Sequence, residues 1–508
     1  ERSIPSAIDG LKTSTRKIMY SAFKRNLVNE IKVAQLGGYV SENSCYHHGE
    51  ASLYGAIINL AQDYIGSNNI NLLSPNGQFG TRLMGGKDSA SERYIFTCLM
   101  DLTLTIFPEA DKPILNYLDD DGTMVEPDFY IPIIPMTLVN GGMGIGTGFS
   151  YKGLCYNPLA IIRHLKSKIS GEKSSLNSLL PYYEGFTGTI SKLSEYKYLV
   201  KGKYTIISYD TIKITELPVG TWTTDYKAYL ETLMEDTKDG KNGKKKKKQV
   251  VKSISDLCTD KTIEFQVKLY PGILQSLLSS TGDHGCNKLE KVLKLYSTQT
   301  TSNMHLFNKD QQLIKFNTID DIYNEYYGVR LNAYEKRKIH QINVLKKEVL
   351  KLSNKARFIE ENLDGTIDLR KKKKDIVITL LTERSYSSLE NDQEFKYLRK
   401  MPMDSLEEEN IIKLRKDRDN NMKDLEVLKN KSIEQMWIDE LDILEVKFKT
   451  YQEKRNKKDT VKKTNRKANK KANKKANKKA NKKANKTVNK FDKTPIKKID
   501  LTKIKIKN

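Results

Sequence analysis

The clearest hydrophobic pattern lies in the last third of the chain, from about Asp320 onward. A helical stretch is expected from about Leu406 to Phe448, with apolar contacts at Leu414, Leu425 and Leu428. Before it, apolar residues recur at alternating intervals of three and four, at Ile342, Leu345, Val349, Leu352, Ala356, Ile359 and Leu363. This heptad spacing predicts a long helix that faces a partner helix. We expect two antiparallel helices with a small cap, residues 365–402, between them; an ordinary helical bundle is the alternative.

The earlier part of the chain shows shorter patterns. IKVAQLGGYV and PIIPMTLVNGG, both within the first 150 residues, are typical of strands or buried segments that end in glycine turns. In a second unit, from about 152 to 310, ISYDTIKITELPVGTWTTDYKAYLETLM predicts strands followed by a helix. The polar insertion GKNGKKKKKQ, residues 240–249, is expected to form a surface loop. At 508 residues the chain should hold two to four domains.

The charge is concentrated at the C-terminal end. From Lys454 onward there are 24 basic and 3 acidic residues, which account for +21 of the net charge of +25. This tail repeats KANK from Lys467, Lys471, Lys475, Lys479 and Lys483. Such a segment cannot bury enough apolar surface to fold, so we expect a disordered tail. It could bind nucleic acid or act as a nuclear address, with a passive solvated tail as the alternative.

The remaining composition bounds the cellular setting. Five cysteines without CxxC spacing, at positions 45, 98, 155, 258 and 286, predict neither a disulfide framework nor a zinc site and suit a reducing compartment. The apolar run near Ile131 to Val139 is too short to cross a bilayer. Because the chain begins at Glu1 rather than methionine, it is expected to be part of a longer protein.

Candidate chemistry begins with Tyr94. It directly follows Arg93 in GKDSASERYIFT, which comes after the glycine-rich run NGQFGTRLMGG. A phenol has a pKa of about 10 and is a poor nucleophile unless its neighbours favour the phenolate. An adjacent guanidinium supplies such charge and can also hold a phosphate through two parallel hydrogen bonds. A half-buried aromatic residue near a helix end is the alternative.

Two further segments carry polar groups suited to a phosphate. In YHHGEASL, His48 could donate to a phosphate or to a leaving 3′ oxygen and Ser52 could hold the backbone, whereas His47 suits a helix cap. Near the turn at Asp9-Gly10, a helix beginning around Thr13 would place Lys12, Arg16 and Lys17 at its N-terminus, where the helix dipole also favours phosphate. A solvated basic helix face is the alternative, above all for Lys17.

The glycine-rich segment GGMGIGTG, residues 141–148, fits neither GxGxxG nor GxxxxGK[ST], so it does not predict a nucleotide-binding loop. Its glycines would let the backbone approach another molecule closely, with Ile145 as the one large apolar projection. Such a side chain can enter between base pairs and kink a duplex. A place in the hydrophobic core is the alternative for Ile145.

Taken together, many long motifs in one order resemble the breakage-reunion core of the type IIA DNA topoisomerases of eukaryotes and large DNA viruses. The resemblance covers roughly residues 1 to 450. It rests on RSIPSxxDGLK, IKVAQLGGYVSE, YHHGEASL, IGSNNINLL, NGQFGTR, GGKDSASERYIFT, LDDDG, VEPDFYIPIIPM, LVNGGMGIGTG, GFTGTI, ITELPVGTWT, YYGVRLNAYEKRK and IEQMWIDEL.

The resemblance implies a role for each matching residue. Tyr94 would attack a DNA phosphodiester and become joined to the 5′ phosphate, Arg93 would stabilise the transition state, and His48 would support cleavage. Ile145 would intercalate and bend the cut segment. Contacts with DNA are expected from Lys12, Arg16, Tyr46, Ser52, Arg82 and Trp222.

The same resemblance implies a multidomain α+β fold. Its parts would be a winged-helix domain (1–151), a mixed α/β tower (152–315), a coiled-coil and C-gate dimerisation domain (316–452) and a disordered Lys-rich tail (453–508). Thr13 and Thr15 stand where the family usually has proline and glutamine. Gly220 stands where it often has arginine.

Cofactors and partners follow from the resemblance as well. The complete enzyme would use Mg²⁺ and ATP, with both sites outside this chain, so no metal or cofactor ligands are expected here. Expected partners are double-stranded DNA, a second copy in a homodimer, and ATPase and TOPRIM regions, upstream or on a separate polypeptide; no membrane is involved. The setting would be the nucleus or a viral replication site. This chain alone should bind DNA but cleave it poorly; a non-catalytic DNA-bending protein is the competing interpretation.

Overall fold

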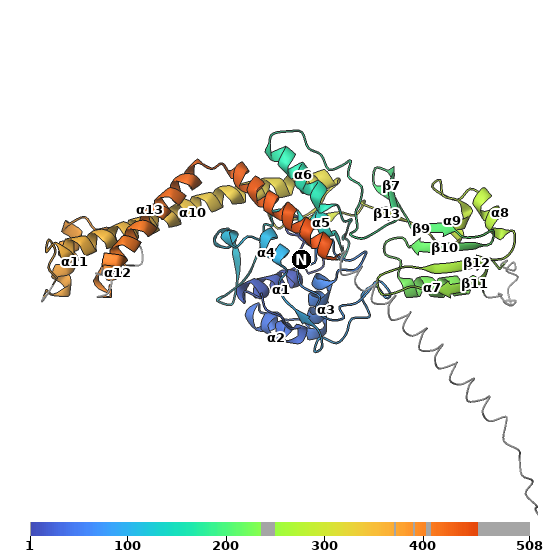
Figure 1. Cartoon of the computed structure of the whole chain (residues 1–508), viewed down its shortest axis with the longest axis horizontal. Coiled ribbons are helices and arrows are strands. Elements are labelled where there is room, and N and C mark those ends of the chain that lie inside the picture. Colours follow the sequence, from blue (N-terminus) through green and yellow to red (C-terminus); the bar gives the residue numbers. More distant parts are fainter. Residues whose placement is uncertain (1, 235–248, 370–371, 390–391, 403–407, 456–508) are drawn as a thin grey trace, which may run out of the picture. The chain divides into compact units, whose positions relative to one another are not determined.

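The computed structural model describes residues 2–234, 249–369, 372–389, 392–402 and 408–455, in two units that divide at Glu445 and Val446. The sequence elements expected at 240–248 and in the tail from 456 lie outside these residues. Within the first unit, helices and small antiparallel sheets alternate (Figure 1). This confirms the expected mixed α/β character.

Three helices build the first compact region: α1 (Thr13–Lys24), α2 (Val33–Asn43) and α3 (Glu50–Ala61). Each buries apolar residues spaced three or four apart and packs against the other two. IKVAQLGGYV was expected to be a strand or a buried segment that ends in a glycine turn. Its burial is confirmed, but the turn was wrong, because only Ile31–Lys32 (β1) is extended and the rest is the partly buried helix α2. Gly37 lies inside that helix at a point where Tyr54 of α3 comes very close. A Cβ at position 37 would be 2.3 Å from Tyr54 Cε1, so a larger residue would clash.

Short elements complete this region. They are β2 (Phe96–Thr97), which pairs with β1, α4 (Asp101–Ile106), the 3₁₀ helix η1 (Glu109–Ile114), the hairpin β3 (Tyr117–Asp120) and β4 (Thr123–Pro127), α5 (Met136–Asn140), and the hairpin β5 (Gly142–Ile145) and β6 (Ser150–Gly153). The stretch PIIPMTLVNGG is the buried α5, which ends at Gly141 with φ of 60°, as a buried segment with a glycine turn should.

The region after β6 contains two antiparallel sheets. After α6 (Pro158–Ile169), one sheet has the order β13-β8-β7 and the other β11-β12-β10-β9. The expected strand followed by a helix is confirmed as β10 and α7, whose buried faces share one apolar core with α8 and α9. The bounds are β7 (Thr189–Ser194), β8 (Lys197–Lys201), β9 (Lys203–Ile206), β10 (Thr211–Glu216), α7 (Thr223–Thr232), β11 (Val251–Asp256), β12 (Phe265–Leu269), α8 (Ile273–Ser279), α9 (Lys288–Val292), β13 (Tyr296–Thr300), β14 (His305–Phe307) and β15 (Leu313–Lys315).

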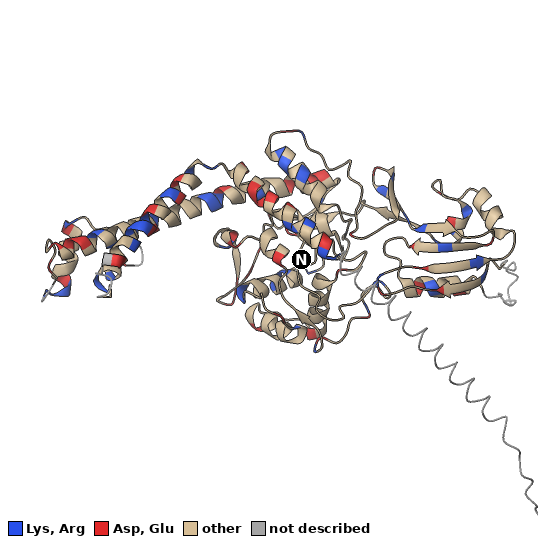
Figure 2. Cartoon of the chain, in the orientation of Figure 1, with Lys and Arg blue, Asp and Glu red and all other residues tan. Residues whose placement is uncertain are grey.

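A long helical hairpin follows. Helix α10 (Ile319–Leu363) packs along α13 (Glu408–Asn430), with acidic and basic residues interspersed on their surfaces (Figure 2). Arg415 bonds to Glu360 near one end, and the Lys338 ammonium donates to the Lys429 carbonyl near the other, so the two helices run antiparallel. The expected apolar seam is half-buried or buried along its length except at Leu363, which is 56 % exposed where the helix ends.

One expectation for this hairpin was wrong. The second helical stretch is interrupted at residues 431–432, and a separate helical segment begins at 433. The Lys338 ammonium donates to the carbonyls of Lys429 and Lys431 at 3.0 and 2.7 Å, while the Ser432 hydroxyl accepts the Gln435 amide. These bonds pair carbonyls at the end of the first helical segment and an amide at the start of the second. The break therefore leaves fewer backbone groups without a partner.

The expected cap between the helices is present and has its own small core. It contains α11 (Lys374–Glu383) and α12 (Lys396–Arg399). Its buried residues are Phe358, Ile367, Val377, Leu381, Tyr386, Phe395 and Leu398.

The base of α10 is joined to η1 through buried charges. Arg330 Nη1 lies 2.5 Å from Asp111 Oδ2, and Arg337 contacts both Asp111 (3.2 Å) and Glu440 (2.6 Å). Trp437 is fully buried beside them and donates to the Ile133 carbonyl. This network fixes the start of the helical hairpin to the first compact region.

Candidate functional site

Tyr94 stands on a turn that the neighbouring residues hold rigidly. Its side chain is 71 % exposed, whereas Ile95 beside it is buried. The Val33 amide donates to the Ile95 carbonyl (3.0 Å) and the Ala34 amide to the Glu92 carbonyl (3.2 Å), which fastens the turn to the start of α2. On its other side, Phe96 exchanges two backbone bonds with Asn76. The phenol therefore projects outward from a fixed backbone.

Arg93 lies next to that phenol. Its guanidinium carbon is 5.8 Å from the centre of the Tyr94 ring, and its side chain is exposed. The pair therefore presents a hydroxyl nucleophile and a bidentate cation on one surface. The alternative of a half-buried Tyr94 near a helix end does not describe this arrangement.

The loop between α2 and α3 carries Tyr46 and His48, whose rings meet edge to face with centroids 5.4 Å apart. His48 is exposed, and Ser52 is exposed in the first turn of α3. His47 is also exposed, with Nε2 4.0 Å from Asp120 Oδ2, so it does not cap a buried carbonyl. Burial, and then the nearby carboxylates of Glu50 and Glu92, raise the pKa of Tyr54 on α3.

The two expected phosphate ligands near the turn before α1 differ in their accessibility. Lys12 precedes the helix and is half-buried, which lowers its pKa. Arg16 is only 7 % exposed, and its guanidinium is bound to Asp9 Oδ2 (2.8 Å), Asp9 Oδ1 (3.1 Å) and the Leu11 carbonyl (3.0 Å). Thr15, which stands where the family usually has glutamine, fits this turn. Its hydroxyl accepts a 2.8 Å hydrogen bond from the Lys12 amide and donates one, also of 2.8 Å, to the Lys12 carbonyl.

Arg82 belongs to the glycine-rich loop, against which Trp222 packs at Gly85. Arg82 is 3 % exposed and binds Glu216 (2.5 Å) and the Leu217 carbonyl (2.9 Å). Trp222 precedes α7 and packs against Gly85, while the Thr224 amide donates to the Leu83 carbonyl. Gly220 has φ of 85° and is exposed, a conformation in which an arginine would be strained.

Replacing Gly85 by alanine tests how Trp222 is positioned. The added Cβ would lie 2.3 Å from Trp222 Cε2 at φ of 62°, so the indole must move. We expect a loss of about 2 kcal/mol in stability or more, from overpacking and backbone strain together. Thermal unfolding measures it. Gly122→Ala is the control, because φ there is also positive (83°) but nothing lies within 4 Å; equal losses in the two variants would show that contact with Trp222 is irrelevant.

Ile145 ends β5 at the tip of the hairpin and is 72 % exposed. Met143, two residues earlier on the same face of the strand, is exposed as well. Gly144 points the other way and lies against Ser3, whose carbonyl oxygen would be 2.2 Å from a Cβ. The hairpin thus presents an apolar projection to solvent, and the alternative of a core position for Ile145 was wrong.

The structure also brings forward a residue that the sequence did not single out. Lys32 is exposed and lies opposite Phe96 in the β1–β2 register, two residues from Tyr94 along that strand. Only the pairing of distant strands reveals this. A lone lysine before a helix carries no comparable signal in the sequence.

Within the described ranges, no three His, Cys, Asp or Glu residues are grouped so that they could hold a metal ion. No chemical step below depends on a metal ion held by the described residues. The five cysteines are free thiols. No described helix is long and apolar enough to span a membrane.

Comparison with known proteins assigns the family. The model of the DNA gyrase/topoisomerase IV A-subunit family matches residues 2–442, and the chain belongs to this family. It is 42 % identical over 480 residues to DNA topoisomerase 2-alpha of Gallus gallus and 38 % identical over 504 residues to DNA topoisomerase 2 of Drosophila melanogaster. These alignments cover 88 % and 89 % of this chain.

The fold agrees with that assignment. The crystal structure of the Plasmodium falciparum topoisomerase II DNA-binding, cleavage and re-ligation domain superposes with a TM-score of 0.81 at 40 % identity, over 90 % of this chain and 63 % of that one. The chain spans 30 % of the chicken relative and 34 % of the fly relative.

Proposed function

We propose that this chain is the DNA-binding and cleavage core of an ATP-dependent type II DNA topoisomerase. The observation that carries the proposal is the exposed Tyr94 hydroxyl, held beside Arg93 on a turn anchored from both sides. In the reaction, the Tyr94 hydroxyl gives up its proton to water as its oxygen attacks a DNA phosphorus, the bond from phosphorus to the 3′ oxygen breaks, and that oxygen takes up a proton. The product is a 5′-phosphotyrosyl link, which conserves the phosphodiester energy for resealing.

Arg93 would meet the charge that develops on the transferring phosphate. His48, exposed in the loop before α3, would supply a proton or a hydrogen bond to the leaving oxygen. A break in both strands needs two such tyrosines, so we propose a twofold homodimer as the working unit. A second duplex passes through the break, which changes supercoiling and unlinks DNA rings.

The DNA surface that we propose differs in part from the one expected from sequence. Lys12, Tyr46, Ser52 and Trp222 are at least partly accessible and keep their roles as DNA contacts. Lys32 joins them because it pairs with Phe96 on β2, the strand that follows Tyr94. The buried guanidiniums of Arg16 and Arg82 are instead committed to carboxylates, so we assign them to positioning the turn before α1 and the loop that carries Trp222.

Ile145 is proposed to enter the duplex and bend it. Ile145→Ala removes most of an apolar side chain that would be buried among bases, a loss of about 2 kcal/mol. We therefore expect the ratio of bent to unbent DNA to fall roughly tenfold or more, as measured by energy transfer between dyes at the duplex ends. Ile412→Ala, at an exposed isoleucine on α13, should leave bending unchanged. If Ile145→Ala bent DNA as much as the unsubstituted protein does, Ile145 would not be the side chain that bends the duplex.

We also propose boundaries for the domains of this chain. Residues 1–151 would be a winged-helix domain, 152–315 a tower and 316–452 a coiled-coil gate that dimerises. Residues 453–508 would be a Lys-rich DNA-associated tail. Mg²⁺, ATP, and the ATPase and TOPRIM regions would belong to the complete enzyme, which would act in the nucleus or at a viral replication site.

The decisive experiment is to trap the covalent complex. The complete enzyme is incubated with DNA labelled on the 3′ side of the break, whose 5′ phosphate would become joined to Tyr94, stopped with detergent, and assayed for label bound to protein. A second candidate function, DNA bending without cleavage, is favoured by the exposed hairpin tip alone. It predicts bent DNA but no trapped complex under any condition.

A further inference from the structure

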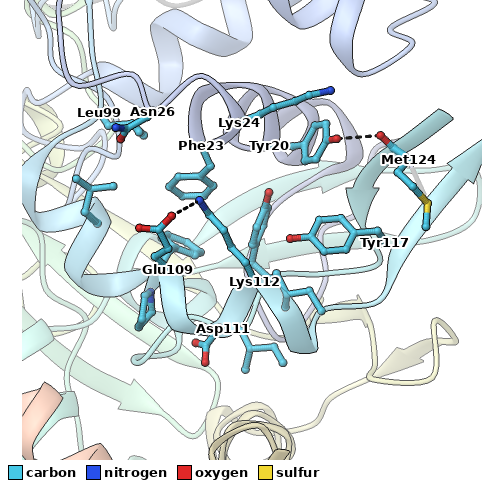
Figure 3. Close-up of a pocket in the computed structure, with 16 residues that line it drawn as sticks. Tyr20, Phe23, Lys24, Asn26, Leu99, Glu109, Asp111, Lys112, Tyr117 and Met124 are labelled. Atoms are coloured by element: carbon cyan, nitrogen blue, oxygen red, sulfur yellow. Dashed lines mark hydrogen bonds and ion pairs between the residues drawn. The ribbon is translucent and has the colours of Figure 1, made fainter. Parts of the chain in front are cut away.

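A cavity of about 560 Å³ lies between α1, α4, η1 and the β3–β4 hairpin, apart from Tyr94 and the proposed DNA contacts (Figure 3). Five aromatic rings line it, from Tyr20, Phe23, Phe107, Tyr117 and Tyr130. The rings of Phe23, Phe107 and Tyr130 meet one another at centroid distances of 5.4 to 5.8 Å. A concave apolar site of this size with a few polar groups is typical of small-molecule binding.

Two polar groups in the cavity are unused. Tyr130 is only 6 % exposed, and its hydroxyl has no hydrogen-bond partner among the described residues. The hydroxyl of Tyr117 likewise has none there, and Figure 3 shows it pointing toward the middle of the cavity. By contrast, the Tyr20 hydroxyl donates to the Met124 carbonyl at 2.8 Å. A hydroxyl that faces a cavity without a protein partner is available to donate to a ligand atom there.

The chemistry of these groups defines the ligand. Burial raises the pKa of both Tyr117 and Tyr130, so both phenols stay protonated and can donate. The carboxylates at the rim are already paired: Glu109 with Lys112 at 2.9 Å, and Asp111 with Arg330 and Arg337. Lys24 also lines the cavity, and its ammonium lies 5.5 Å from the centre of the Tyr20 ring. The ring walls favour a flat aromatic molecule, which needs no charged partner.

We propose that this cavity binds a neutral, planar aromatic molecule that offers a hydrogen-bond acceptor, such as a ring ketone or ring nitrogen, to the hydroxyls of Tyr117 and Tyr130. The site is formed by side chains that take no part in the proposed DNA chemistry. Its existence therefore does not depend on the proposed cleavage reaction.

The test compares two small molecules that differ only in the acceptor. Fluorenone carries a ring ketone, and fluorene has the same flat tricycle without it. Each is titrated into the 508-residue chain without DNA, and binding is followed by ligand-observed NMR. We expect fluorenone to bind with a dissociation constant of about 0.1 mM and fluorene about tenfold more weakly.

Variants then locate the binding site. Tyr130→Phe removes only the buried hydroxyl, so the chain should fold as before and fluorenone should bind about tenfold more weakly, as fluorene does. Tyr209→Phe, at an exposed tyrosine in the β9–β10 loop, is the matched control and should change nothing. Leu104→Trp, at the partly exposed edge of the cavity, should block both molecules. Equal binding of fluorenone and fluorene, unchanged fluorenone binding by Tyr130→Phe, or no binding at all would each overturn the proposal.

Discussion

Tyr94→Phe is expected to abolish the covalent protein–DNA complex while leaving DNA affinity within about twofold. The substitution removes one oxygen from an exposed ring and leaves the turn untouched, because that turn is held by backbone bonds and the buried Ile95. Loss of a nucleophile typically lowers a rate by roughly a million-fold, so trapped complex should fall below detection. DNA affinity depends on the basic surface, which keeps every charge.

The experiment uses detergent trapping for the complex and a filter or anisotropy assay for affinity, both at one fixed salt concentration. Tyr209→Phe is the matched control, since Tyr209 is at least as exposed but lies on the β9–β10 loop. It should trap as much DNA as the unsubstituted enzyme. Undiminished trapping by Tyr94→Phe would mean that another side chain is the nucleophile.

Arg330→Met is expected to destabilise the unit that contains η1 and the base of α10 by about 3–5 kcal/mol. Burial alone lowers the pKa of Arg330, but the Asp111 carboxylate more than offsets this, so its pKa lies above the ordinary value. Methionine fills similar space without charge. Asp111 then stays buried and keeps only the 3.2 Å contact with Arg337, and the Ile131 carbonyl loses its 2.7 Å donor.

The fluorescence of Trp437 can report the loss of stability in this region of the structure. This tryptophan is fully buried against the rings of Tyr326, Tyr327 and Tyr334, and the chain has only one other tryptophan. In a Trp222→Phe background, denaturant titration of tryptophan fluorescence therefore reports on this region alone.

Arg415→Met is the control for the same titration. Its guanidinium pairs with Glu360 at the surface at 2.5 Å, and both side chains are well exposed. Such a pair contributes at most about 1 kcal/mol. If Arg330→Met shifted the midpoint no more than Arg415→Met does, the buried network would not be what fastens the hairpin to η1.

Sequence patterns predicted the elements whose signal is local. The heptad seam of α10, the strand-then-helix order of β10 and α7, and the cap between the long helices all follow from spacing along the chain. The stretch after Lys32 was misread because its glycines suggested a turn. The close approach of Tyr54 to Gly37, which explains a glycine in the middle of α2, involves a residue far along the chain.

The candidate site also has some features that the sequence predicts and others that only the fold decides. Sequence alone determined the family, the Arg93–Tyr94 pair and the basic tail, because each rests on which residues occur and in what order along the chain. Only the tertiary structure decided that Arg16 and Arg82 are buried while Tyr94 and Ile145 face solvent, since exposure depends on what distant segments place alongside a residue. Asp9 and Glu216 take up those two arginines, whereas the turn at Tyr94 and the hairpin tip at Ile145 have no described residue packed over them.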